Sequence, residues 1–361
     1  MTLRGISLRN FRNYETLDLT FNDHLNLFHG KNAQGKSNLL EAIQVLALTR
    51  GFRSKSDREL ARLSAPGFEL SGEFVGDSKV AHRVVVCFDK VEGKSVSLDR
   101  KRLPSTSSLI GMFPLASFSP ESHRITSGPP VERRRFLDML LCQSSPGYLA
   151  DLVEYNRVLR QRNALLAQAL PAGAKNLEAW SESFANHGCR LTSARYQFSH
   201  AYAEILQQAY QRISASSLPF QLVYRSQLDF DAINPERFLA LLAEQRQAEQ
   251  RQKRTLVGPH LDDLVMQIGG KELRRYGSRG EHKTALMSLK MAEVNYLQAR
   301  TATAPIVLLD DLPSELDGER MENALESFRA CGQVFVTSLN EILLSSSARY
   351  EVSGGTVRLL N

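Results

Sequence analysis

Apolar and polar residues alternate over much of the first ninety residues of the chain. The alternation runs through residues 3–21, in two parts that flank residues 10–14, and returns at 68–74 and 80–88 on either side of a Gly76-Asp77 turn. Alternation puts every second side chain on one face of a strand, so each run predicts a half-buried strand. We therefore expect a mixed sheet with an antiparallel wing.

The pattern changes near residue 132, where helical spacing begins and continues for about eighty residues. Apolar residues recur every seven positions in two series, which are separated by residues 171–176: Leu152, Leu159 and Leu166, then Leu177, Phe184, Leu191, Phe198 and Ile205. This period predicts an antiparallel helical hairpin. A helix over residues 177–216 would be roughly 60 Å long at 1.5 Å per residue. A compact helical subdomain without an extended arm fits the pattern equally well.

Strand-like residues return at 220–224, and Pro235 begins a polar helix that continues to Arg254. The chain is thus α/β in class, with an inserted helical segment. We expect three parts: residues 1–120 form the first part of an α/β lobe, 121–217 the helical insertion, and 218–361 the second part of the lobe.

A phosphate-binding loop is predicted at residues 30–37, which read GKNAQGKS and fit the pattern G-x-x-x-x-G-K-[ST]. A short apolar run at 25–28 predicts a strand directly before it, and residues 37–43 predict a helix directly after it. An ordinary glycine-rich turn is the alternative. The order of strand, loop and helix favours the phosphate loop.

The residue types in this loop suit a bound phosphate. Gly30 and Gly35 permit backbone angles that let successive N–H groups turn inward on phosphate oxygens. Lys36 would reach the β and γ phosphates, and the Ser37 hydroxyl would ligate Mg²⁺.

The second half of a nucleotide site is predicted at the apolar run 306–309, which Asp310 and Asp311 follow in the manner of a Walker B strand. Asp310 would hold Mg²⁺ and its water shell, and Asp311 would orient the attacking water. Two acidic residues could also simply end a strand. The candidate catalytic residues are Lys36, Asp310 and Asp311, and the candidate metal ligands are Ser37 and Asp310.

Residues 276–283 form a small-residue turn at the start of an amphipathic helix, which is a second anion cradle. A single chain gains little from two distant cradles. Two chains arranged head to tail could place this turn on the γ phosphate held by the partner's Lys36. The pattern therefore favours an ATP-dependent homodimer.

The formal net charge of the 361 residues is +6, which favours a polyanionic partner such as nucleic acid. Residues 50–58 carry a net charge of +3. Candidate contacts to the DNA backbone are Arg50, Arg53, Lys55 and Arg58. Such contacts would be salt-sensitive and insensitive to sequence, and a solvated surface is an equally good interpretation.

The four cysteines are widely separated and form no C-x-x-C pair, so they indicate neither a zinc site nor a disulfide framework. No apolar run approaches the roughly 20 residues of a membrane helix, and no export signal begins the chain. We expect no membrane association and a cytoplasmic location.

Taken together, several motifs resemble the RecF family of bacterial recombination mediators, which are ABC-type ATPases of the SMC class. The matching stretches span nearly the whole chain and are residues 10–14, 30–38, 118–121, 133–138, 258–260, 276–283, 308–317 and 333–337. Two positions depart from the usual pattern, because Leu261 replaces an arginine and Glu281 replaces the glutamine of many ABC proteins.

The resemblance implies an ABC-type ATPase head with an inserted α-helical arm. It implies that Arg12 approaches the nucleotide and that Ser278 to Glu281 act in trans as the signature loop. It also implies a Q-loop at residues 120–121, a D-loop at 314–317, and Thr337 at the position of the transporter switch histidine. The candidate nucleotide-binding residues are Arg12, Gly30, Lys31, Asn32, Ala33, Gln34, Gly35, Lys36, Ser37, Asn38, Ser278, Arg279, Gly280 and Glu281.

By the same resemblance, an ATP-driven dimer would clamp DNA at single-strand gaps or at junctions of single-stranded and duplex DNA. It would help RecO and RecR load RecA, and a weak, DNA-stimulated ATPase would reset it. Two other hypotheses are an SMC-like ATPase that processes DNA ends and the ATPase subunit of a transporter.

Overall fold

The computed structural model describes residues 1–54, 56–76, 78–168, 175–214, 217–228, 230, 233–311, 328, 331–340 and 347–360. The chain divides into two compact units. Unit 1 comprises Met1–His123, Ala209–Ala215 and Lys283–Asn361, and unit 2 comprises Arg124–Gln208 and Ser216–His282. Within the described residues, no helix has the length and apolar character needed to cross a bilayer.

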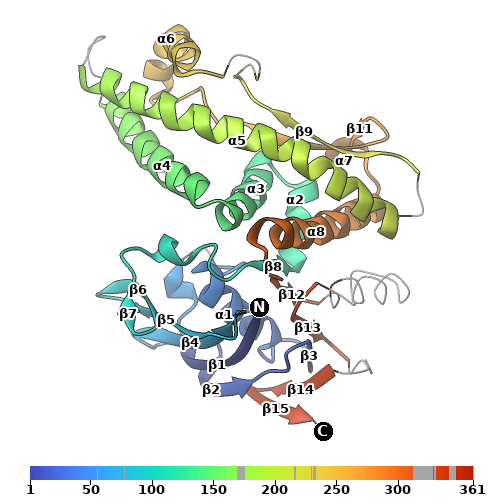
Figure 1. Ribbon diagram of the computed structural model, residues 1–361. Coiled ribbons are helices and arrows are strands. Elements are labelled where there is room, and N and C mark those ends of the chain that lie inside the picture. Colours follow the sequence, from blue (N-terminus) through green and yellow to red (C-terminus); the bar gives the residue numbers. More distant parts are fainter. Residues whose placement is uncertain are drawn as a thin grey trace. The chain divides into compact units, whose positions relative to one another are not determined.

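The first sheet of unit 1 is antiparallel throughout, in the order β2-β1-β4-β5-β6-β7 (Figure 1). Its strands are β1 (Thr2–Phe11), β2 (Tyr14–Thr20), β4 (Gly67–Val75), β5 (Ala81–Asp89), β6 (Gly93–Leu98) and β7 (Lys101–Arg102). Leu8 lies opposite both Leu17 and Leu70, and all three are buried, so the alternating apolar residues share one face. The predicted antiparallel wing is confirmed.

The second sheet of unit 1 has the order β15-β14-β3-β13-β12-β8 and is parallel except for β15. Its strands are β3 (Leu25–His29), β8 (Leu115–Phe118), β12 (Ile306–Leu309), β13 (Val334–Ser338), β14 (Ser347–Ser353) and β15 (Thr356–Leu360). All four residues of β12 are buried, which confirms the predicted buried strand. Because β3, β12 and β13 are parallel, their carboxyl ends meet at one edge, where Gly30, Asp310 and Thr337 lie.

Helix α1 (Lys36–Leu48) packs against both sheets of unit 1. Nearly all its residues are buried, so it is apolar on several faces instead of one. The buried side chain of Gln333 also joins the sheets, because it accepts a hydrogen bond from Leu3 N at 2.7 Å and donates to Leu3 O at 3.0 Å. Among the described residues, the other helical segments that contribute to unit 1 are η1 (Asp57–Glu59), η2 (Thr106–Leu109), η3 (Pro120–His123), the end of α5 (Lys175–Ile213) and most of α8 (Arg279–Thr301).

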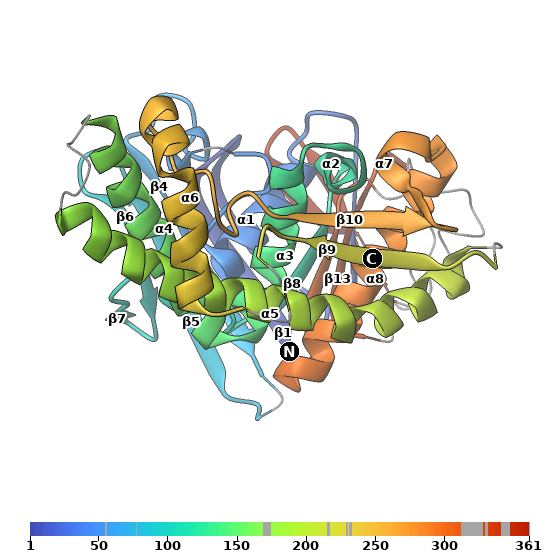
Figure 2. The same ribbon diagram turned by 90° about the horizontal axis from the view of Figure 1, so that it is seen from above.

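Unit 2 combines helices with a small antiparallel sheet of order β11-β10-β9. Figure 2 shows β9 and β10 side by side. The helices are α2 (Arg124–Ser127), α3 (Pro130–Ser144), α4 (Pro146–Ala167), α5 (Lys175–Ile213), α6 (Pro235–Gln252) and α7 (Leu273–Tyr276). The strands are β9 (Phe220–Arg225), β10 (Asp263–Ile268) and β11 (Lys271–Glu272).

The helices α4 and α5 form the predicted antiparallel hairpin. Arg195 Nε donates to the Tyr148 hydroxyl at 2.8 Å, and the rings of Tyr155 and Phe184 stack at 4.7 Å. The residue numbers of these contacts increase along α4 and decrease along α5, so the two helices run antiparallel. The 39 residues of α5 span about 58 Å at 1.5 Å per residue.

Helix α6 packs against the hairpin in unit 2. Phe238 of α6 packs against Phe184 with ring centroids 5.5 Å apart, and Arg162 of α4 donates to Glu249 of α6 at 2.6 Å. Unit 2 also contains residues 218–282, which we assigned from the sequence to the second part of the lobe. The division of the chain at 120 and 217 stays a prediction.

Candidate nucleotide-binding site

The predicted phosphate loop lies between the end of β3 and the start of α1, and Gly35 precedes the helix. Gly30 has φ 150° and Gly35 has φ 121°, conformations that favour glycine. A Cβ on Gly35 would also lie 2.7 Å from the side chains of Asn13 and Tyr14. The backbone conformation of both residues and the close contacts around Gly35 therefore explain why the motif has glycine at these positions.

Neighbouring turns hold this loop in position. The Tyr14 hydroxyl donates to Gly35 O at 3.0 Å, and Asn13 Nδ2 donates to Gln34 O at the same distance. Gly354 N donates to Gln34 Oε1 at 2.7 Å. Burial raises the pKa of Tyr14, so its hydroxyl keeps the proton that it donates. Our list of candidate residues omitted Asn13 and Tyr14, although the family resemblance marked their segment.

The Lys36 ammonium lies over the loop, where Nζ donates to Gly30 O and, at 2.8 Å, to Lys31 O. Burial lowers the pKa of Lys36, and the negative charges of Asp311 and Asp310 oppose that shift. A phosphate would exchange these carbonyl contacts for stronger ones to its own oxygens.

The nucleotide contacts predicted for the other residues of the loop stay predictions. Lys31, Asn32 and Ala33 are exposed, and Ala33 has φ 63°. Asn38 Nδ2 donates to Asn13 Oδ1 at 2.7 Å.

Ser37 and Asp310 are the two predicted metal ligands, and the structure brings them together. Ser37 Oγ donates to Asp310 Oδ1 at 2.7 Å, although the two residues are 273 positions apart in the chain. Asp310 is only 1% exposed. Burial raises its pKa, and hydrogen bonds from Thr337 and Ser37 act in the opposite direction. A hydroxyl and a carboxylate oxygen at hydrogen-bond distance are hard ligands of the kind Mg²⁺ prefers, so this pair fits the ion.

Thr337 connects the two acidic residues of the Walker B strand. Its hydroxyl donates to Asp310 Oδ1 at 2.7 Å and accepts from Asp311 N at 2.9 Å. Asp311 has φ 57°, a left-handed conformation that aspartate adopts more readily than most residues. Thr337 therefore contacts the Asp310 carboxylate and the Asp311 backbone from the end of β13.

Arg12 lies beside α1. Its Nε donates to Glu41 Oε2 at 2.9 Å, and its Nη2 donates to Ser54 Oγ at 2.6 Å. Glu41 is fully buried and was absent from our sequence-based candidates. In the sequence, only the position of Glu41 on the first helical turns after the phosphate loop could have indicated that it belongs to the site. The approach of Arg12 to the nucleotide stays a prediction.

Arg53, a predicted DNA contact, lies at the Walker B carboxylate. Its Nη2 contacts Asp310 Oδ2 at 2.9 Å, and its Nε contacts Glu121 Oε1 at 3.3 Å. Arg50 and Arg58 are exposed. Lys55 and the predicted D-loop at 314–317 lie outside the described residues.

The predicted signature turn lies in unit 2 at the start of α8. Ser278 N donates to Glu281 Oε2 at 2.8 Å, and Glu281 N donates to Ser278 Oγ at 3.2 Å. This reciprocal pair is a capping box, which satisfies two helix N–H groups. The hydrogen bonds from Ser278 lower the pKa of Glu281. Arg279 and Gly280 lie between the two partners, and the action of this turn in trans stays a prediction.

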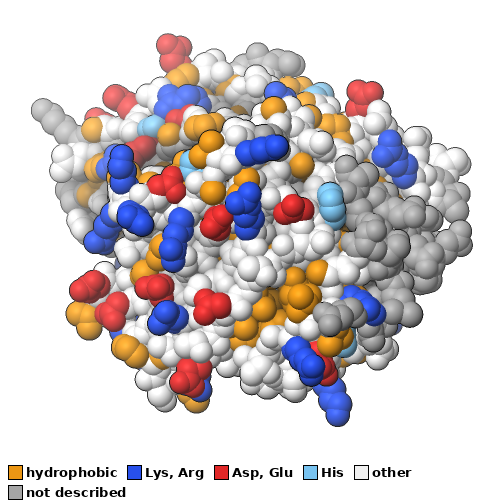
Figure 3. All heavy atoms as spheres, turned by 60° about the horizontal axis from the view of Figure 1, so that its bottom comes forward, with side chains coloured by type: hydrophobic (Ala, Val, Ile, Leu, Met, Phe, Trp, Pro, Cys, Tyr) orange, Lys and Arg blue, Asp and Glu red, His pale blue; other side chains and the backbone are white. Residues whose placement is uncertain are grey.

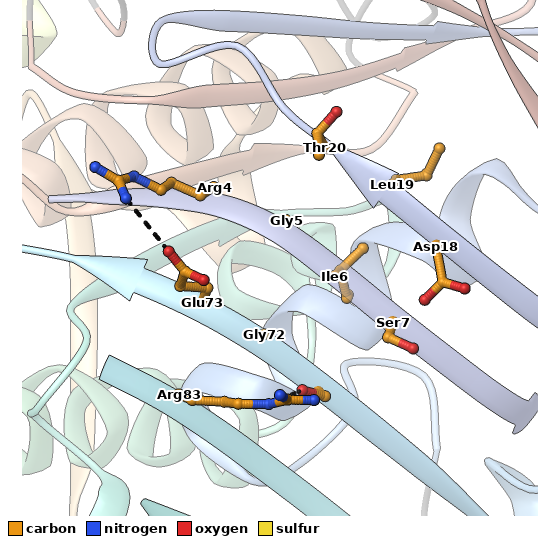
Figure 4. A pocket seen from close by; sticks show the side chains of 11 residues that line it. Arg4, Gly5, Ile6, Ser7, Asp18, Leu19, Thr20, Gly72, Glu73 and Arg83 are labelled. Carbon is orange, nitrogen blue, oxygen red and sulfur yellow. Dashed lines mark hydrogen bonds and ion pairs between the residues drawn. The ribbon is translucent and has the colours of Figure 1, made fainter. Parts of the chain in front are cut away.

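Surface charge, a surface hollow and clusters of potential metal ligands also bear on what the chain could bind. On the face shown in Figure 3, the basic and acidic side chains of the described residues are intermingled. A hollow of about 560 Å³ lies on the outer face of the wing and is lined by Arg4, Ser7, Glu73 and Arg83 among others (Figure 4). None of the predicted site residues lines it. Among the described residues, no group of three His, Cys, Asp or Glu side chains could hold a metal ion.

Comparisons with known proteins concern the chain as a whole. The family model described as RecF/RecN/SMC N terminal domain matches residues 2–354. The DNA replication and repair protein RecF of Chlorobium phaeovibrioides (strain DSM 265 / 1930) is 38% identical over 348 residues, which cover 94% of this chain and 93% of the relative.

Two solved structures extend the comparison to the fold. The recombination mediator protein RecF-ATP in the RecFOR pathway has a TM-score of 0.91 and 30% identity, covering 100% of this chain and 98% of that chain. An SmcHead bound to the C-winged helix domain of ScpA has a TM-score of 0.57 at 13% identity, covering 100% of this chain and 97% of that chain, and shares the fold alone. The predicted α/β fold of the ATPase-head type is confirmed. The chain therefore belongs to the RecF family.

Proposed function

We propose that this chain is an ATP-gated DNA-binding protein of recombinational repair and replication restart. The observation that carries the proposal is the 2.7 Å contact between Ser37 of the phosphate loop and Asp310 of the Walker B strand. These two motifs form a nucleotide site only when they adjoin. The solved relative with bound ATP, which is 30% identical, supports ATP as the nucleotide.

Each residue at this site has a defined task in the proposal. The N–H groups of residues 30–37 and the Lys36 ammonium bind the β and γ phosphates. Ser37 and Asp310 hold Mg²⁺, which when bound neutralises phosphate charge and orients the oxygens. Asp311 orients the attacking water and accepts its proton. Thr337 holds the Asp310 carboxylate and the Asp311 backbone in place.

The site of one chain is incomplete in this proposal until a second copy supplies its signature turn. The N-terminus of the 23-residue helix α8 carries a partial positive charge, which suits a γ phosphate. The capping box between Ser278 and Glu281 holds the turn in one conformation before it meets the phosphate. ATP therefore joins two copies, and hydrolysis separates them.

The DNA-bound dimer is the functional state in this proposal. A net charge of +6 favours contact with the DNA backbone, and Arg50 and Arg58 are exposed and available for it. The dimer clamps duplex DNA beside a single-strand gap in the cytoplasm and, with RecO and RecR, helps load RecA. Slow, DNA-stimulated hydrolysis resets the clamp.

The test measures DNA affinity on gapped, single-stranded and duplex substrates with ATP, with ADP and without nucleotide. We expect the tightest binding with ATP, and we expect Lys36→Met to remove that difference together with ATP-dependent dimerisation in light scattering. Lys90→Met, which removes an exposed lysine between β5 and β6, is the matched control. Equal affinities in all three nucleotide states would refute the clamp.

Two outcomes would favour the other hypotheses. Divalent-metal-dependent cutting of a plasmid by the pure protein would favour the processing of DNA ends. Co-purification with a membrane protein would favour a transporter subunit.

A further inference from the structure

Arg53 bridges two carboxylates of unit 1. Its Nη2 lies 2.9 Å from Asp310 Oδ2, and its Nε lies 3.3 Å from Glu121 Oε1. The three side chains differ in exposure, because Asp310 is 1% exposed, Arg53 35% and Glu121 43%. The guanidinium therefore covers a buried carboxylate from the solvent side.

The backbone at Arg53 is anchored independently of its side chain. Glu41 Oε1 accepts from Arg53 N at 3.1 Å and from Ser54 Oγ at 2.9 Å, and Glu41 is fully buried. Its other oxygen accepts from Arg12 Nε at 2.9 Å. The guanidinium can therefore move between its two carboxylate partners while the main chain stays in place.

The position of Arg53 conflicts with the proposed magnesium site. Asp310 Oδ1 accepts from Ser37 and Thr337, and Oδ2 contacts Arg53. A divalent cation on Ser37 and Asp310 would therefore share its carboxylate with a guanidinium. Two positive charges that share one carboxylate repel each other, and the repulsion is strongest where water is excluded.

We propose that Arg53 is a built-in counter-cation, which pairs with Asp310 when the site lacks Mg²⁺ and moves to Glu121 alone when Mg²⁺ and nucleotide bind. The proposal rests on the proposed function, because it requires that Ser37 and Asp310 hold the ion. Its consequence is an autoinhibitory contact: the metal site opens only when Arg53 leaves.

The direct test uses the unmodified protein and phenylglyoxal, which reacts with accessible guanidinium groups. Mass spectrometry would quantify labelling in EDTA, in Mg²⁺, in a fluorescent ADP analogue with EDTA, and in that analogue with Mg²⁺. We expect Arg53 labelling to rise at least about threefold in the last condition, as the protected state is depopulated. Arg50 and Arg58 of the same segment are internal references and should not change.

A second measurement titrates Mg²⁺ against binding of the fluorescent ADP analogue. Removal of the competing guanidinium in Arg53→Gln should lower the half-saturating Mg²⁺ concentration by roughly threefold to tenfold, because the competent fraction of the site increases. Lys90→Gln removes an exposed positive charge of the same unit and should leave that concentration unchanged. Arg53→Lys keeps the charge without the planar fork and should give an intermediate value.

The outcomes separate this inference from the proposed function. Mg²⁺-dependent binding of the analogue with constant Arg53 labelling, or with an unchanged half-saturating concentration in Arg53→Gln, would overturn the inference and leave the nucleotide site intact. A protein that fails to bind the analogue at any Mg²⁺ concentration would overturn both.

Discussion

At the residue scale, the Walker B strand depends on a side chain outside it. The Thr337 hydroxyl is both donor and acceptor, and it joins the carboxylate of Asp310 to the backbone of Asp311. Thr337 is 1% exposed, so water cannot replace either contact. One hydroxyl therefore holds the Asp310 carboxylate and the main chain at Asp311.

Thr337→Val should test this arrangement, because valine keeps the shape and removes the hydroxyl. The substitution leaves Asp311 N–H without its acceptor and should lower the free energy of unfolding by about 1–3 kcal/mol. It should also weaken Mg²⁺-dependent nucleotide binding. Urea denaturation and nucleotide titration measure the two effects.

Thr301→Val is the control for Thr337→Val. The Thr301 hydroxyl donates to Leu297 O at 2.8 Å within its own helix and touches neither acidic residue. We expect a loss below about 1 kcal/mol and unchanged nucleotide binding. Equal effects of the two variants would contradict the role given to Thr337.

At the scale of elements, the connection between α6 and β10 is held by buried polar contacts of unit 2. The Tyr155 hydroxyl lies 2.7 Å from His260 Nδ1, and Arg195 Nη1 donates to Pro259 O at 2.6 Å. Leu261 is 45% exposed in the same loop, so the departure from the family pattern lies at the surface. These two contacts do not involve the side chain at position 261.

The free energy of unfolding should depend on pH through the ionisation of His260. The pKa of His260 is lowered to about 4, mainly by burial; the hydrogen bond with the Thr255 backbone opposes this shift, and the charges of Arg134, Arg162 and Arg195 add to it. The unfolded chain binds this proton near pH 6.5, so between about 6.5 and 4 the unfolded state carries more protons. The free energy of unfolding therefore decreases as the pH falls through that window.

The contribution of His260 should be about 2 kcal/mol between pH 7 and pH 5. Urea denaturation at the two pH values should show that His260→Asn loses this part of the pH dependence, whatever its stability at pH 7. His24→Gln removes an exposed histidine as the control. An unchanged pH slope in His260→Asn would contradict a ring that stays neutral in the folded state.

At the scale of the whole molecule, hydrolysis is expected to time the release of DNA. Asp311→Asn preserves the left-handed backbone at φ 57°, because asparagine tolerates that conformation, and it removes the proton acceptor. We expect hydrolysis to slow by roughly 100-fold or more while ATP still binds. The ATP-bound dimer should then persist on DNA.

Phosphate release and size-exclusion chromatography on DNA measure the two effects of Asp311→Asn. Asp23→Asn, an exposed substitution in unit 1, should behave like the parent protein. If Asp311→Asn hydrolyses ATP at the parental rate, Asp311 does not have the assigned role.

The sequence by itself determined the features that depend on residues close together in the chain. Alternation predicted β1, β2, β4 and β5, and the seven-residue period predicted α4 and α5. The phosphate loop was readable because its glycines, lysine and serine act within eight consecutive positions. Local geometry decides these features, so a local pattern reveals them.

Only the tertiary structure decided which distant residues share the site. Ser37 meets Asp310 across 273 positions, and Arg53 lies against the same carboxylate instead of serving only as a surface charge. Glu41 joins Arg12 to the segment at Ser54. No local pattern encodes these contacts, because they arise when parallel strands and α1 bring their ends to one edge of the sheet.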